Sequence, residues 1–261
     1  MTGTPRDPWF RLGLSTPARI AIGRAGSSLP TREVLSFALA HARARDAVHA
    51  RLDSAALAAR LQGMGHATVQ VDSEARDRSL YLRRPDLGRA LDAPSRERLR
   101  QCRREMGPRT CDLAVLVGDG LSATAVAAGA PVLIDALRPH LARLGLETGP
   151  IVLAEGARVA LGDEVGEILG ARLVVVLIGE RPGLSAADSL GVYLTFAPRR
   201  GRTDAERNCI SNIRPGGLAP SVAAQSLAWL MQAALARGLT GVALKDESGG
   251  LPSSAATPPL P

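Results

Sequence analysis

Residues 173–184 read LVVVLIGERPGL, and this stretch decides the fold. Its first six residues form a continuous apolar run rich in β-branched side chains, which is typical of a strand buried on both faces of a parallel sheet. The run then changes abruptly to glycine, charge and proline. Gly179 lets the backbone turn, and Pro182 stiffens the loop. Because open α/β sheets bind ligands beyond the carboxyl ends of their strands, we expect the loop 179–184 to face a ligand.

Similar runs elsewhere in the chain extend this expectation to a whole sheet. Further strands are predicted at 68–72, 113–117, 151–154, 192–196 and 210–213. Two helices are predicted to begin at a capping residue: one at Thr31, and one at Asp163 that ends at Gly170. Further helices are predicted at 55–61, from Pro94 to near Met106, after residue 123, and at 220–236. Residues 79–89 are predicted to form a mixed loop. This alternation predicts an α/β fold with a mostly parallel, Rossmann-like sheet and helices on both faces, preceded by a smaller, mainly helical N-terminal region.

The same pattern predicts how the chain is divided. We expect a mainly helical region at 1–105 that contacts a partner, an α/β domain at 106–245, and a disordered tail at 246–261 that is rich in Ser, Gly and Pro. No apolar run is long enough to span a bilayer, and the first ten residues contain no signal-peptide core. Three cysteines without a framework spacing favour a reduced, cytoplasmic protein.

The formal net charge of +7 raises the possibility of a nucleic-acid-binding protein. The cations are almost all arginines interleaved with acids, and no basic block is paired with aromatic side chains that could stack on bases. The pattern therefore favours solvated helix faces over a nucleic-acid site.

Residues 118–123 match the pattern G-x-G-x-x-A between a predicted strand and a predicted helix, which is a weak dinucleotide fingerprint. The fingerprint requires an acid at the end of the next strand, roughly 20 residues on. Asp135 is near that distance, but it lies in a predicted helical segment. A nucleotide-dependent oxidoreductase that uses the Gly118–Ala123 turn therefore remains the alternative function.

Metal-binding and nucleophilic motifs are weak. The four histidines have no ligand spacing, and no Cys-x-x-Cys or G-x-S-x-G motif is present. Arg207 and Arg214 could lower the pKa of the Cys209 thiol, although a small apolar residue at a strand start is the favoured interpretation. His41 and His49 share one helix face, which is either a polar working face or an interface.

Several motifs in a fixed order resemble those of a known family. They are TPARI (16–20), AHARARDAV (40–48), LYLRRPDLGR (80–89), DGLS (119–122), GEILG (166–170), GERPGL (179–184) and CISNI (209–213). Together they cover most of the chain, and they resemble the small (light) subunit of ethanolamine ammonia-lyase.

The resemblance implies a lyase that converts ethanolamine to acetaldehyde and ammonia by adenosylcobalamin-dependent radical chemistry. The large subunit, a TIM barrel, would catalyse the reaction within a hetero-oligomer, and no catalytic residue would lie in this chain. By resemblance, the cobalamin contacts are Val159, Glu180 and Cys209, all within 106–245. Because no histidine here lies in a D-x-H-x-x-G motif, we expect the cofactor to keep its own base on cobalt.

Many members of the family have a longer N-terminal extension that directs them to a bacterial microcompartment. The start of this sequence is short and contains proline. We therefore expect a cytoplasmic protein and leave residence in a microcompartment open.

Overall fold

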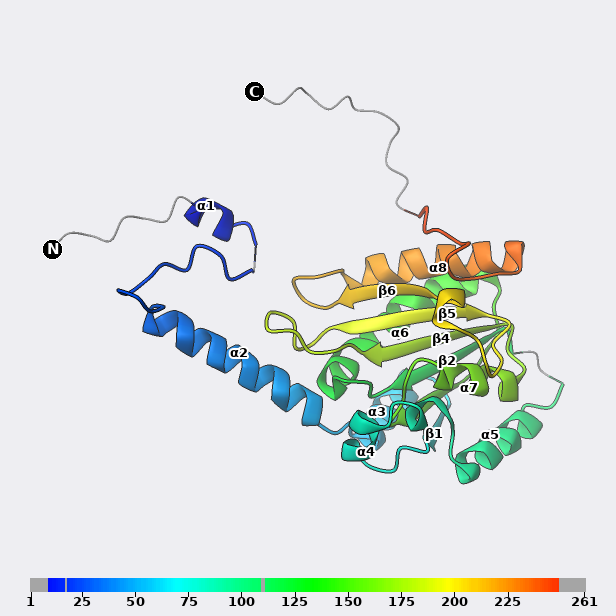
Figure 1. Ribbon diagram of the computed structural model, residues 1–261. Coiled ribbons are helices and arrows are strands. Elements are labelled where there is room, and N and C mark those ends of the chain that lie inside the picture. The colour runs from blue at the N-terminus through cyan, green and yellow to red at the C-terminus, as the bar shows by residue number, and fades with distance from the viewer. Residues whose placement is uncertain (1–8, 17, 109–110, 249–261) are drawn as a thin grey trace, which may run out of the picture.

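The computed structural model describes residues 9–16, 18–108 and 111–248 (Figure 1). The predicted disordered tail lies outside these residues from 249 onward, and residues 246–248 are in neither a helix nor a strand. No helix in the described ranges is long and apolar enough to cross a bilayer.

One six-stranded sheet contains all the predicted strands, in the order β1-β3-β2-β4-β5-β6. The strands are β1 (Thr68–Asp72), β2 (Leu113–Gly118), β3 (Thr148–Glu155), β4 (Leu173–Gly179), β5 (Leu190–Phe196) and β6 (Asn208–Ile213). The strands β1, β3, β2 and β4 are parallel to one another, whereas β5 is antiparallel to β4 and β6 is antiparallel to β5. The α/β prediction is confirmed, but the mostly parallel, Rossmann-like description is not, because the sheet is mixed.

The mixed topology follows from the length of the connection after β4. A parallel crossover needs about a dozen residues or more, usually with a helix, and only residues 180–189 separate β4 from β5. The chain therefore returns as an antiparallel hairpin.

Helices cover both faces of the sheet, as predicted (Figure 1). One face packs against α3 (Ser54–Gly63), α6 (Ala123–Leu144) and α8 (Pro220–Arg237), and the other packs against α5 (Ala93–Glu105) and α7 (Leu161–Leu169). Side chains of β2 and β4 alternate between two apolar clusters, one on each face, so both strands are buried throughout. This double burial explains the continuous apolar runs in their sequences.

The N-terminal part contains α1 (Phe10–Gly13), α2 (Thr31–His49), α4 (Arg78–Arg83) and the 3₁₀ turn Leu87–Arg89. Strand β1, which precedes residue 105, is an edge strand of the same sheet. The division of the chain at residue 105 stays a prediction. Figure 1 shows α2 running outward from the body, and Ala47 is its one buried residue.

Three local predictions were wrong. The segment 79–89 is not a mixed loop, because Asp77 accepts a hydrogen bond from the backbone N–H of Leu80 and caps α4. Thr31 is the first residue of α2 and not its cap. Asp163 lies in the first turn of α7, where its side chain is used in a buried ion pair described below.

Candidate functional site

The antiparallel edge of the sheet presents a row of residues on the face that carries α7, and this row is accessible only around Tyr193. Along β5, Gly191, Tyr193 and Thr195 point to this face, because their neighbours Leu190, Val192 and Leu194 belong to the cluster on the opposite face. Helices α5 and α7 pack against β1, β2 and β4. Around Tyr193 the sheet surface is reachable: Tyr193 is half-buried, and Cys209 and Ser211 on β6 are exposed.

Glu180 lies at one end of this row. Its Oε2 accepts a hydrogen bond from the Ser189 hydroxyl and another, of 3.1 Å, from the backbone N–H of Asn212. The missing side chain of Gly191 makes room for it, since a Cβ there would lie 3.0 Å from Oε1. Among the described residues, no hydrogen bond is made to Oε1 of Glu180. The carboxylate is therefore held in place by one oxygen, and the other can accept a hydrogen bond from a ligand.

Cys209 lies beside Glu180 and Tyr193. It pairs with Tyr193 across β5 and β6. Although Cys209 is exposed, the surrounding protein partly desolvates its thiol and raises the pKa of that thiol above its ordinary value, and the negative charge of Glu180 adds to the effect. Arg214 is bonded instead to the side-chain oxygen of Asn212 at 2.8 Å. The structure therefore does not support an activated, nucleophilic cysteine.

Val159 lies in the connection between β3 and α7 and packs against the apolar cluster beneath α7, as Tyr193 also does. The structure thus brings Glu180 and Cys209 together and places Val159 on the same face of the sheet. Their role in binding a cofactor stays a prediction.

A buried ion pair at the other end of the row was not predicted. Arg207 donates to both carboxylate oxygens of Asp163, at 2.5 and 2.7 Å, and also to the hydroxyl of Thr195 at 3.1 Å. Both charged side chains are almost fully buried, at 2% and 3% exposed. The pair ties the start of α7, just after Val159, to the start of β6, just before Cys209. The one signal in the sequence was the pair of adjacent acids, Asp163 and Glu164, in the otherwise apolar first turns of the helix LGDEVGEIL.

The Gly118–Ala123 turn is filled by the chain itself. Asp119 accepts a 3.0 Å hydrogen bond from the backbone N–H of Ala157, and the Tyr81 hydroxyl donates to the carbonyl of Ala157 at 3.1 Å. A Cβ on Gly118 would lie 2.7 Å from that of Ala157, and one on Gly120 would collide with Gly179. Burial raises the pKa of the Asp119 carboxyl and raises that of Tyr81 to about 12.

These glycines therefore allow close packing within the protein. Asp135 lies on α6 and pairs with Arg138 at 3.0 Å, with its side chain 58% exposed. It is not at the end of a strand, where a ribose-binding acid is needed. The nucleotide-dependent oxidoreductase is not supported.

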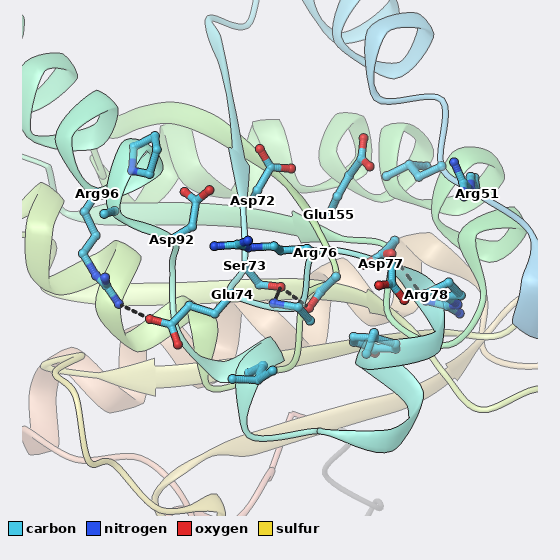
Figure 2. Close-up of a pocket in the computed structure, with 18 of the residues that line it drawn as sticks. Arg51, Asp72, Ser73, Glu74, Arg76, Asp77, Arg78, Asp92, Arg96 and Glu155 are labelled. Carbon is cyan, nitrogen blue, oxygen red and sulfur yellow. Dashed lines mark hydrogen bonds and ion pairs between the residues drawn. The ribbon is translucent and has the colours of Figure 1, made fainter.

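A polar groove of about 780 Å³ opens beyond the carboxyl ends of β1 and β3 (Figure 2). Its lining combines carboxylates such as Asp72 and Glu155 with the guanidinium groups of Arg51 and Arg76. Burial and the neighbouring charges of Glu155 and Asp92 raise the pKa of Asp72. None of the predicted cofactor residues lines the groove. Within the described ranges, no group of three or more His, Cys, Asp or Glu side chains could hold a metal ion.

Comparisons with known proteins agree with the motif order. The model of the family "Ethanolamine ammonia-lyase light chain (EutC)" matches residues 6–245. The chain is 58% identical over 245 residues to a protein of Bradyrhizobium diazoefficiens, covering 94% of this chain and 92% of that protein. It is 56% identical over 233 residues to a protein of Rhodopseudomonas palustris (89% and 88% covered) and 56% identical over 241 residues to one of Ralstonia nicotianae (92% and 89% covered). All three are named ethanolamine ammonia-lyase small subunit.

Proposed function

Because the chain belongs to the ethanolamine ammonia-lyase light chain family, we propose that it is the small subunit of an adenosylcobalamin-dependent ethanolamine ammonia-lyase and that it holds the cofactor against a catalytic large subunit. The observation that carries the cofactor assignment is the cluster of Glu180, Tyr193 and Cys209 at the accessible part of the row. The partner assignment is supported by the words "light chain" and "small subunit" in the names of the family and of the relatives.

The residues of the row suit a large ligand with many amide and hydroxyl groups. Glu180 is fixed through Oε2 and cradled by Gly191, so Oε1 is ready to accept a hydrogen bond from an amide or a ribose hydroxyl of the cofactor. Tyr193 and Cys209 would add a contact surface beside it, and Val159 would contribute from the start of α7. When bound, adenosylcobalamin supplies the radical chemistry of the reaction.

In this proposal the chain binds and orients the cofactor and does not ligate cobalt. None of the four histidines lies on β4, β5 or β6: His41 and His49 lie on α2, His66 lies between α3 and β1, and His140 lies on α6. The cofactor would therefore keep its own base on the metal. We propose a cytoplasmic complex and leave residence in a microcompartment open.

Reconstitution tests the division of labour. The purified chain, the large subunit, ethanolamine and adenosylcobalamin are combined, and acetaldehyde is measured with each protein omitted in turn. We expect acetaldehyde only when both proteins are present. Production by this chain alone would show that it carries the catalytic site and would refute the proposal.

The replacement Glu180→Ala tests the cofactor contact. A hydrogen bond to a charged group is worth about 1.5–3 kcal/mol, so the apparent KM for adenosylcobalamin should rise about 10- to 150-fold, with kcat at saturating cofactor nearly unchanged. Glu105→Ala removes an exposed glutamate at the end of α5 and serves as the matched control. An unchanged KM in Glu180→Ala would remove this residue from the cofactor site.

A further inference from the structure

Among the residues that the structure describes, exposed large hydrophobic side chains are concentrated in the N-terminal arm, which we define as residues 9–49. Fourteen large hydrophobic side chains are exposed in the described part of the chain, and ten of them lie between residues 9 and 39. Helix α2, about 28 Å long, provides four of them. They are Val34 (49% exposed), Leu35 (64%), Phe37 (46%) and Leu39 (52%). A concentration of exposed apolar side chains of this kind favours an interaction site.

The distribution of these side chains around α2 indicates the shape of the partner. At 3.6 residues per turn, Val34, Leu35, Phe37 and Leu39 span about 200° of the helix circumference. A helix that packs on one flat surface needs an apolar stripe only about 100° wide. The wider arc favours a groove that contacts the helix on two sides, and such a groove is a feature of a folded protein.

The charge of the arm indicates the chemistry of that groove. The arm contains six arginines and two acids, so it is strongly basic. Two copies of it packed together would bring like charges into contact, which opposes self-association. An apolar groove with an acidic rim on a different protein would complement it.

The base of the arm is fixed to the edge of the sheet that carries the candidate site. Arg78 donates from Nε to the carbonyl of Val48, at 2.7 Å, in the last turn of α2. The same guanidinium donates from Nη1 to the carbonyl of Gly120, at 2.7 Å, beyond the carboxyl end of β2. Gly120 in turn packs against Gly179, next to Glu180. Figure 1 shows α2 leaving the body on the side where the β4–β5 loop lies. A protein that grips the arm is therefore positioned to cover this edge.

We propose that the N-terminal arm inserts into an apolar, acid-rimmed groove of the large subunit and anchors that subunit over the edge of the sheet that carries Glu180. This inference rests on the proposed function for the existence of the large subunit. It adds that α2 is the main docking element and that the same partner binds the arm and covers the edge of the sheet that carries Glu180.

The test measures the affinity of the full-length chain for the tagged large subunit. The double variant Leu35→Glu with Leu39→Glu places two charges on the exposed face of α2 and keeps residues that favour a helix. The control variant is Val222→Glu with Val242→Glu, because both valines are exposed, at 47% and 81%, and lie outside the arm. Thermal unfolding of each isolated variant confirms that it is folded.

We expect the arm variant to bind the large subunit at least 100-fold more weakly than the wild type and the control variant to bind within twofold. Wild-type affinity in the arm variant would overturn the proposal. A wild-type dimer in sedimentation that the arm variant abolishes, with binding to the large subunit unchanged, would assign the arm to a second copy and also overturn it. Arm-dependent binding without ethanolamine turnover supports the docking proposal and refutes the proposed function alone.

Discussion

Asp163→Asn tests the role of the buried ion pair at the end of the row. In the native protein, Arg207 has its charge balanced by two carboxylate bonds to Asp163 and receives further acceptors from Thr195 and the carbonyl of Arg202. Asparagine can replace one of the two bonds and none of the charge. Oδ1 of Asp204 lies 3.4 Å from Nε of Arg207, but the Asp204 side chain is 83% exposed. Water therefore weakens the attraction between the two charges, and Asp204 cannot replace Asp163. The variant therefore leaves a cation buried without a close anion.

The expected loss can be worked out from this geometry. Removing one partner of a buried pair costs about 3–5 kcal/mol, and we place this variant at about 3 kcal/mol because neutral acceptors remain. For a chain of this size the melting temperature should fall by about 6–12 °C. The measurement is thermal and urea unfolding of the isolated chain.

Two further variants separate the explanations. Replacing the pair together, as Asp163→Leu with Arg207→Met, should recover most of the lost stability, because an apolar pair removes the uncompensated charge. Asp86→Asn disturbs the pair with Arg84, in which both side chains are 58% exposed, and should leave the melting temperature nearly unchanged. A loss of less than about 1 kcal/mol in Asp163→Asn would refute the reasoning.

The remaining predictions concern packing and ionisation. Gly166→Ala should destabilise the chain by about 1–3 kcal/mol in urea unfolding, because the new Cβ would lie 2.8 Å from the Cβ of Pro198. Gly63→Ala in α3, where a Cβ meets nothing within 4 Å, should instead stabilise it slightly, and equal effects would contradict the packing argument. The raised pKa of Cys209 leaves less thiolate at any given pH, so its alkylation, followed by mass spectrometry, should accelerate only at a higher pH than for a free thiol. Glu180→Gln removes a neighbouring negative charge and should move that profile to lower pH, and a shift to higher pH would contradict the geometry.

The open face of the sheet shows why the candidate site was only partly predictable. The sequence indicated the loop that bears Glu180, because an apolar strand followed by glycine and charge is a local pattern. The resemblance to a family pointed to Cys209 and Val159. Neither indicated that Tyr193 would lie opposite Cys209, since that contact depends on the pairing of β5 with β6. The Gly118–Ala123 turn matches a dinucleotide fingerprint in sequence, but in the structure it packs against the protein itself, because Tyr81 and Asp119 fill the place that a dinucleotide would need.

The sequence by itself determined the six strands, the main helices and the α/β class, because burial imposes a periodicity on neighbouring residues that can be read directly. The tertiary structure decided which distant groups meet. Asp163 and Arg207 are 44 positions apart, and no local pattern couples them. The tertiary structure also decided that the arm is exposed, since Val34 and Leu35 would suit a buried helix equally well. Whether an apolar side chain is covered depends on where the chain folds back, and that path is set by contacts between residues far apart in the sequence.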